Sequence, residues 1–262
     1  MKKVVAIDTE FERRRTYRPI LSIIQIREGD KDAVVYDVYK QKNENLKNLL
    51  EILSNDDIVK IIHAARQDIE AIFYRFHISI RNVFDTQIGF KIIKHENEVG
   101  YSKLVEEMCG KSIIKEKELQ KSNWLKRPLS ERQISYAKQD VLYLHEVYYK
   151  MMDFFLDNAD KYNEFKNECA YLEDKRNYVF NAMHVWQKMK CNFVNNVNYK
   201  LIKELIISRE RLAYKANIPR EFAIKTEHLI NFAKTGDISM LKTHKKIDKQ
   251  IFIKIANKYI KY

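Results

Sequence analysis

The amino-terminal part of the chain alternates short apolar runs with polar connections, a pattern that predicts strands. Runs rich in β-branched residues cover residues 3–8, 20–26, 32–38 and 57–63, and each has the length of a strand. The first three runs are joined by short connections, which favours antiparallel pairing. A helical segment near residues 45–53 precedes the fourth run, which favours a parallel crossover. The pattern therefore predicts an α/β fold with a mixed sheet flanked by helices.

Helical periodicity dominates after Asp85. The clearest helix is predicted over residues 128–149, where apolar positions repeat at helical spacing and the repeat continues to Met151. Ser130 and Gln133 have the spacing of a capping box at its start. This part of the chain is expected to supply the helices that cover the sheet.

A second group of helices is predicted toward the end of the chain. One helix is expected from Tyr162 to Tyr178 as a link to the basic C-terminal segment. About four short helices after Trp186 would form a small all-α C-terminal domain. The expected breaks between the short helices lie near residues 195–198, 217–219 and 235–238.

Composition limits the size of the fold and the compartment. The 262 residues, 45% of them hydrophobic, are enough for one good core and a smaller second unit. No apolar run approaches the ~18 residues that span a bilayer, and the first run ends at Asp8, too early for a signal peptide. Cys109, Cys169 and Cys191 are far apart, so neither a disulfide framework nor a zinc site is expected. These features predict a cytoplasmic protein without membrane association.

Positive charge is concentrated at the C-terminal end. The net charge of the chain is +12, and residues 185–262 hold 17 Lys and Arg against 6 Asp and Glu, a net of +11. A lysine-rich base composition of the genome would raise the charge everywhere, but the first 184 residues are nearly neutral. The basic segment is therefore predicted to bind a polyanion, most simply nucleic acid.

Three separate segments place acidic side chains where they could share a site. Asp8 and Glu10 end the first predicted strand, and their spacing of two points both to one face, roughly 6.6 Å apart along the chain. Asp68 lies in the first turn of a predicted helix. Tyr136 and Asp140 are four residues apart and share a helical face. Each feature alone has an ordinary explanation, as a solvated turn, a helix cap or an exposed helix face.

Together, the four carboxylates and the phenol suit two-metal hydrolysis of a phosphodiester. Oxygen ligands select Mg²⁺ or Mn²⁺, and two such ions can hold both the attacking and the leaving oxygen. Divalent ions would also offset the repulsion between Asp8 and Glu10. Tyr136, whose ordinary pKa is ~10, is poorly suited to be the base and is predicted to orient the attacking water.

These residues lie in segments that resemble the ribonuclease D family of 3′–5′ exonucleases, in the tyrosine-containing subclass of the DEDD group. The segments are, in order, IDTEFERRRTYRPILSIIQI, KIIHAARQDIEAIF, VFDTQIG and SNWLKRPLSERQISYAKQDVLYL. The resemblance implies an RNase H-like fold, with Asp8, Glu10 and Asp140 on one divalent cation, Asp8 and Asp68 on a second, and Tyr136 positioning the nucleophile. It also implies hydrolysis from RNA 3′ ends, with structured RNA such as tRNA precursors as the usual substrate of the family.

Three further residues are predicted to bind substrate. The resemblance points to His63 and Phe11 at the terminal nucleotide, with stacking the natural role of Phe11; packing is an equally open role for each. Gln133 either caps its helix or faces the substrate, and Asp85 is predicted to cap the helix that follows it.

The basic segment resembles one HRDC domain, a small helical module. Trp186 and the segment LIKELIISRERLAYKANIPREFAIKTEHLINFAK carry this likeness. We therefore predict an exonuclease domain over residues 1–184, which includes a linker helix, and a nucleic-acid-binding domain over residues 185–262.

Two other functions remain open at this point. A DNA 3′–5′ exonuclease would use the same residues, because the metal ions act on phosphate and no residue identifies a reader of the 2′-hydroxyl. A nucleic-acid-binding protein with an inactive nuclease fold would be expected to lack at least one of the acids, whereas this chain has all four.

Overall fold

The computed structural model describes residues 3–96, 98–114, 116–189 and 198–259. The chain divides into two units. Unit 1 comprises Met1–Glu12 and Pro19–Tyr178, and unit 2 comprises Arg13–Arg18 and Val179–Tyr262. The chain therefore enters unit 2 twice, and the boundary predicted at residue 184 stays a prediction.

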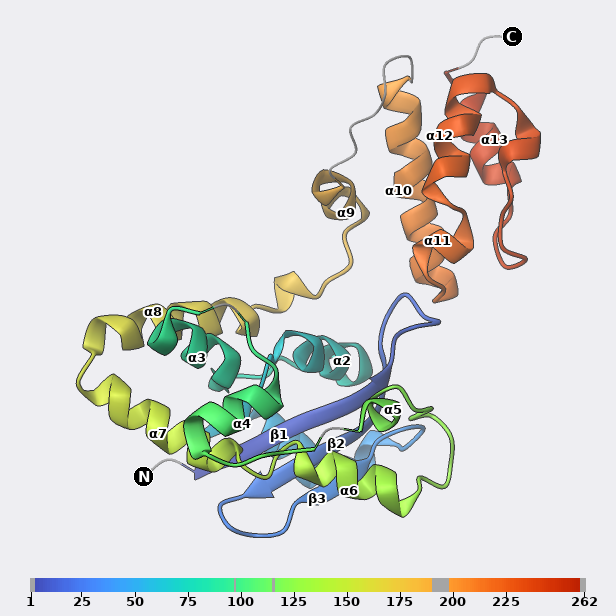
Figure 1. Ribbon diagram of the computed structural model, residues 1–262. Coiled ribbons are helices and arrows are strands. Elements are labelled where there is room, and N and C mark those ends of the chain that lie inside the picture. Colours follow the sequence, from blue (N-terminus) through green and yellow to red (C-terminus); the bar gives the residue numbers. More distant parts are fainter. Residues whose placement is uncertain (1–2, 97, 115, 190–197, 260–262) are drawn as a thin grey trace. The chain divides into compact units, whose positions relative to one another are not determined.

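A five-stranded mixed sheet forms the centre of unit 1 (Figure 1). The strands are β1 (Lys3–Glu12), β2 (Ile20–Glu28), β3 (Val34–Asp37), β4 (Ile58–Ile62) and β5 (Val83–Asp85). Their order is β3-β2-β1-β4-β5. Strand β1 pairs antiparallel with β2 and parallel with β4, as the lengths of the connections predicted. The predicted α/β fold class is confirmed.

Alternation along β1 assigns its side chains to two cores. Val5 and Ile7 pack in a cluster with helix α2 (Arg66–Phe76) and with helix α1 (Lys47–Ser54). Ala6, between them, joins a different cluster. Because successive side chains of a strand point to opposite faces, the two clusters lie on opposite faces of the sheet.

The second face of the sheet is covered by helices from later in the chain. The cluster that contains Ala6 draws buried residues from α3 (Thr86–Lys94), α4 (Tyr101–Cys109), α7 (Leu144–Leu156) and α8 (Ala159–Glu173). Short helix α5 (Lys117–Gln120) and helix α6 (Glu131–Gln139) precede α7.

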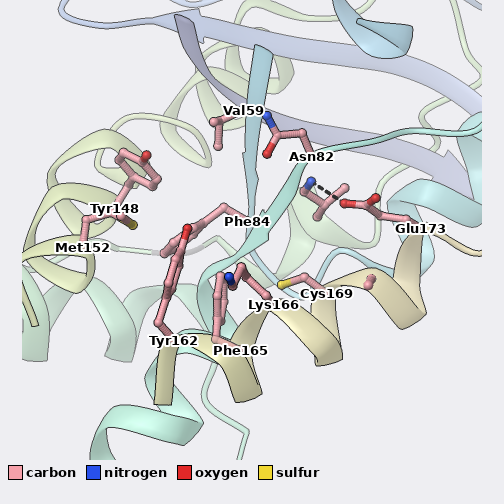
Figure 2. Close-up of a pocket in the computed structure, with 12 residues that line it drawn as sticks. Val59, Asn82, Phe84, Tyr148, Met152, Tyr162, Phe165, Lys166, Cys169 and Glu173 are labelled. Carbon is pink, nitrogen blue, oxygen red and sulfur yellow. Dashed lines mark hydrogen bonds between the residues drawn. The ribbon is translucent and has the colours of Figure 1, made fainter. Parts of the chain in front are cut away.

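Helix α8 also packs beside the edge strand β5. Glu173 Oε1 accepts a hydrogen bond of 2.8 Å from the backbone amide of Val83 (Figure 2). Phe84 packs in a tilted arrangement against Phe165, with ring centroids 4.5 Å apart. A cavity of about 320 Å³ lies here, with Cys169 among its lining residues. The contacts from α8 occupy a polar edge that would otherwise be open for pairing.

The single helix predicted over residues 128–149 is wrong in one respect, because the structure has two helices there. Helix α6 ends at Gln139, and α7 begins at Leu144. The Tyr101 hydroxyl donates to the carbonyl of Gln139 at 3.3 Å and accepts from the amide of Tyr143 at 3.0 Å. This side chain from α4 satisfies backbone groups at the break, which the local periodicity could not reveal.

Other predicted boundaries shift by a few residues. The third strand is confined to Val34–Asp37, and the helix expected from Tyr162 to Tyr178 begins at Ala159 and ends at Glu173. A 3₁₀ turn, Lys175–Asn177, follows it. Strand β5 was not predicted, because three residues are too few to show a period.

Apart from residues 13–18, unit 2 consists of helices and the loops that join them. Its helices are α9 (Ala182–Lys188), α10 (Tyr199–Ala216), α11 (Arg220–Ala223), α12 (Thr226–Thr235) and α13 (Gln250–Ala256). The predicted breaks near 217–219 and 235–238 are confirmed, and most of the predicted break at 195–198 lies outside the described residues. Helix α10, with 18 residues, is longer than expected. No helix in the described part of the chain has the length and hydropathy to cross a membrane.

Residues 13–18 are held in unit 2 by aromatic and polar contacts. The Tyr17 hydroxyl donates to Glu210 Oε2 at 2.6 Å, and its ring packs edge-on against Phe180 and Tyr214, each at 5.8 Å. The backbone amide of Arg18 donates to Asn217 Oδ1 at 2.8 Å. The segment that connects β1 to β2 is thereby part of the packing of unit 2.

Candidate active site

Strand β1 places two carboxylates on one face of the sheet. Asp8 and Glu10 are both half-buried and lie two residues apart, just before a bulge in the pairing with β2 that falls after Glu10. Asp8 lies opposite Gln25 of β2, whose Nε2 donates to Asp8 Oδ2 at 3.2 Å. The fully buried Gln25 amide thus helps to fix the position of the Asp8 carboxylate.

The residue that follows α6 brings a third carboxylate to this face. One oxygen each from Asp8, Glu10 and Asp140 lie within 4.8 Å of one another. Asp140 is 9% exposed, so little water is available to screen the repulsion among the three charges. Three oxygen donors converging at this distance fit a divalent cation such as Mg²⁺ or Mn²⁺.

Tyr136 lies beside this group, one turn before Asp140. Its hydroxyl and the Asp140 carboxylate form a hydrogen bond. Burial raises the pKa of the Tyr136 phenol well above its ordinary value, and the neighbouring carboxylate charges raise it further. The phenol therefore stays protonated at neutral pH and donates its one O–H to the Asp140 carboxylate, which leaves its oxygen able to accept.

The segment before α6 anchors this helix to the sheet. The rings of Trp124 and Tyr136 are 6.2 Å apart, and Ser22 Oγ of β2 donates to the carbonyl of Trp124 at 2.5 Å. The Arg127 guanidinium binds both carboxylate oxygens of Asp37 on β3, at 2.6 and 2.7 Å. These contacts fix α6 and, through it, Tyr136.

Asp68 lies outside the group of three. It is buried in α2, and its Oδ1 accepts a hydrogen bond of 2.5 Å from Thr9 Oγ1. Thr9 points to the opposite face of β1 from Asp8 and Glu10. Burial raises the pKa of Asp68 to about 7, opposed by the hydrogen bond from Thr9. The structure thus brings three of the four predicted carboxylates together, and a metal-binding role for Asp68 stays a prediction.

Asp85 caps α3, as predicted. Its Oδ1 accepts from the amides of Gln87 and Ile88 at 2.8 and 3.4 Å. The same carboxylate also accepts from the amides of Ala64 and Ala65, at 3.1 and 2.8 Å. One buried side chain therefore fixes both the start of α3 and the turn that leads into α2.

His63 is held by the protein at both ring nitrogens. Nδ1 lies 3.0 Å from Thr86 Oγ1, and Nε2 lies 3.0 Å from the carbonyl of Val99. A carbonyl only accepts, so Nε2 carries the proton and Nδ1 accepts from the threonine. These contacts support the packing role of His63.

The other two predicted substrate contacts also have partners within the fold. Phe11 is partly buried and packs against the core that contains α2. The Gln133 side chain completes the predicted capping box with Ser130, and its Nε2 donates to Ser122 Oγ at 3.0 Å. Substrate binding by these residues stays a prediction, and capping by Gln133 is confirmed.

Sequence reasoning missed Gln25, Tyr101 and Thr9. Gln25 gave a usable signal, because it is a polar residue within the apolar run ILSIIQI. Tyr101 gave none: its effect on the break before α7 depends on contacts far along the chain. Thr9 alternates with the two acids and would have been assigned to the core.

A model of the 3′–5′ exonuclease family matches residues 1–154. The chain is also 34% identical to ribonuclease D of Gluconacetobacter diazotrophicus over 232 residues, which cover 88% of this chain. The chain belongs to the 3′–5′ exonuclease family. It spans 58% of the length of that ribonuclease D.

Solved structures of similar proteins agree with this family and with the fold. Ribonuclease D of Escherichia coli, described as an exoribonuclease involved in structured RNA processing, has a TM-score of 0.83 and 26% identity, covering 98% of this chain and 69% of that one. Brucella melitensis NrnC with bound Mg²⁺ has a TM-score of 0.59 and 25% identity, covering 74% of this chain and 90% of that one.

Proposed function

We propose that this protein is a metal-dependent 3′–5′ exoribonuclease that removes nucleotides from the 3′ ends of RNA. The observation that carries the proposal is the convergence of Asp8, Glu10 and Asp140 oxygens within 4.8 Å, with the Tyr136 hydroxyl bonded to one of them. Membership in the 3′–5′ exonuclease family and the similarity to ribonuclease D support the same activity.

The proposed substrate is structured RNA, with tRNA precursors the foremost candidate. The Escherichia coli relative is described as processing structured RNA, which supports this choice. The helical part of unit 2 would act as an HRDC-like RNA-binding domain, because residues 185–262 carry a net charge of +11. We place the activity in the cytoplasm, where the free thiols of Cys109 and Cys169 would stay reduced.

We assign a separate role to each residue of the candidate active site. Asp8, Glu10 and Asp140 would hold one divalent cation. Asp68, which lies outside this group, would serve a second cation with Asp8, as the resemblance to ribonuclease D implies. When bound, the ions supply charge stabilisation at the phosphate and an activated water. Tyr136, protonated and donating to Asp140, would orient the nucleophilic water by accepting a hydrogen bond at its phenol oxygen. Gln25 holds the Asp8 carboxylate in place.

A digestion assay with an RNA that has a 3′ extension tests this function. The wild-type chain with Mg²⁺ or Mn²⁺ is expected to release nucleoside monophosphates, and Asp8→Asn and Asp140→Asn are expected to abolish release. Asp153→Asn, which neutralises an exposed aspartate of α7, is the matched control. Undiminished release by Asp8→Asn would refute the mechanism.

Two further measurements test the alternative functions, a DNA exonuclease and an inactive nucleic-acid-binding protein. Parallel digestion of RNA and DNA of the same sequence separates an RNA from a DNA exonuclease. Calorimetric titration with Mn²⁺ separates an active site from an inactive one, because a site of converging carboxylates binds the ion and Asp8→Asn weakens binding. A chain that binds no divalent cation and releases no nucleotide from either polymer would be the idle binding protein.

A further inference from the structure

A basic groove runs along helix α10 in unit 2. The groove has a volume of about 570 Å³ and is bordered by α10 and by the end of α13 with the turn after it. Its charged lining residues are Lys200, Lys203, Glu204, Arg211 and Lys258. All of them belong to the helical part of unit 2, and none is among the carboxylates of the candidate active site.

Helical spacing puts the cations in a row. Lys200, Lys203 and Arg211 lie on one face of α10, with Ile207 between them on the same face. The eleven residue steps from Lys200 to Arg211 span roughly 16 Å along the helix axis. A row of this length matches a short stretch of extended polymer rather than one small anion.

The charge of the groove is not balanced by the protein. Within the described residues, Lys200, Lys203, Arg211 and Lys258 make no ion pair with a carboxylate. The one acid of the lining, Glu204, accepts a hydrogen bond of 2.5 Å from the Tyr259 hydroxyl. By contrast, Arg209 on the same helix pairs with Glu210 and Glu221. Four unpaired cations around one hollow therefore favour a polyanionic ligand.

Apolar and aromatic side chains also line the groove. They are the buried Ile207 and Ile255 and the half-buried Tyr259. A tyrosine ring beside lysines provides a face on which a base can stack while the cations contact phosphates. An acidic peptide would use the cations but would gain nothing specific from the ring.

We propose that this groove binds the phosphate backbone of a single-stranded segment of the RNA substrate, with Tyr259 stacking on a base. The proposal rests on the proposed function, since it names the surface by which unit 2 holds the same RNA. Lys200, Lys203, Arg211 and Lys258 contact successive phosphates.

Binding of a labelled 12-nucleotide oligouridine to the full-length chain tests this site. All arms carry Asp8→Asn, so the RNA stays intact and the result does not depend on hydrolysis. The groove variant is Lys200→Gln/Lys203→Gln/Arg211→Gln. The control is Lys234→Gln/Lys245→Gln/Lys246→Gln, which removes three exposed positive charges of unit 2 outside the groove.

The groove variant is expected to bind at least about tenfold more weakly at 0.1 M salt, and its log–log salt slope is expected to fall by about 2, because each lost phosphate contact removes about 0.7. Tyr259→Leu should weaken binding with little change in the slope. The control should stay close to the parent. Circular dichroism confirms that each variant is folded.

Equal losses in the groove variant and the control would overturn the proposal, because net charge alone would then explain binding. An unchanged affinity of the groove variant would also overturn it. Displacement of the RNA by polyglutamate at equal concentration, with no effect of Tyr259→Leu, would assign the groove to an acidic protein partner instead. The exoribonuclease assignment is tested separately, because it fails only if the wild-type chain releases no nucleotides from RNA.

Discussion

Thr9 Oγ1 donates a hydrogen bond of 2.5 Å to Oδ1 of Asp68, and so ties the strand that carries Asp8 and Glu10 to the helix behind it. The Asp68 side chain is buried, and this burial raises the pKa of its carboxyl to about 7. The carboxyl is therefore largely protonated below neutral pH in the metal-free protein. Without a cation nearby, the folded state has to accommodate a charged Asp68 only above that pH.

The first prediction concerns stability and pH. An unfolded Asp has a pKa of about 3.9, so between roughly pH 4 and pH 7 the folded chain binds more protons at Asp68 than the unfolded chain does. The free energy of unfolding of the metal-free protein should therefore fall as pH rises through this window, by about 3 kcal/mol between pH 5 and pH 8. Urea denaturation in EDTA at pH 5 and pH 8 measures the change.

Asp68→Asn is the matching control for this effect. The amide oxygen can still accept from Thr9, but the side chain does not titrate. The variant should lose the part of the pH dependence that Asp68 contributes and should be more stable than the wild type at pH 8 in EDTA. An equal slope in both proteins would place the titrating group elsewhere.

The second prediction concerns the hydroxyl group of Tyr136. Tyr136→Phe removes the hydroxyl bonded to Asp140 while keeping the ring that packs near Trp124. We expect kcat for nucleotide release to fall by ~10²–10⁴, with little change in Mn²⁺ affinity because the three carboxylates remain. Tyr171→Phe, at an exposed position of α8, controls for loss of a hydroxyl. Wild-type turnover in Tyr136→Phe would remove this residue from the mechanism.

The third prediction concerns a buried ion pair in unit 2. Arg209 and Glu210 have fully buried side chains, with Arg209 Nη2 2.9 Å from Glu210 Oε1, and Arg209 Nη1 also donates to Thr226 Oγ1 at 2.6 Å. Arg209→Met leaves the Glu210 charge buried without its main partner and should destabilise unit 2 by about 3–5 kcal/mol. Faster hydrogen exchange of the α10 amides reports the loss.

A double variant separates the charge from the packing. Arg209→Met/Glu210→Leu removes both charges and should recover much of the stability lost in Arg209→Met. If the double variant were as unstable as the single one, packing rather than the unpaired charge would be responsible.

The fourth prediction concerns close packing between α3 and α7. A Cβ added at Gly89 would lie 2.8 Å from Met151 Sδ and 3.6 Å from Phe165 Cε2. Gly89→Val should therefore destabilise unit 1 by about 1–3 kcal/mol through overpacking. Gly100→Ala, where no atom lies within 4 Å, is the control. Thermal unfolding should show partial recovery when Met151→Ala is combined with Gly89→Val.

Sequence patterns predicted the sheet well because its strands are long or β-branched enough to show a period. They missed β5, which has three residues, and they joined α6 to α7 because the apolar repeat runs through the break. Tyr101 satisfies the backbone there from a distant helix, and no local pattern encodes such a contact.

The candidate site was predictable in part for a related reason. Asp8 and Glu10 share a face by the geometry of any strand, and Asp140 follows Tyr136 by the geometry of any helix. Where Asp68 points depends on how α2 packs against β1, and the structure turns it toward Thr9. Packing between elements is a long-range property that spacing within one element does not contain.

Unit 2 contains residues 13–18 as well as the C-terminal helices, and this has a practical consequence for dissecting the protein. A shortened chain that stops at Tyr178 would keep Tyr17 and Arg18 while deleting Phe180, Glu210 and Asn217, which bind them. Residues 13–18 begin three residues after Glu10. A fragment without the C-terminal helices would therefore expose the side chains of this segment next to β1, the strand that carries Asp8 and Glu10. Point substitutions, rather than truncation, are the sound way to assign work to each half.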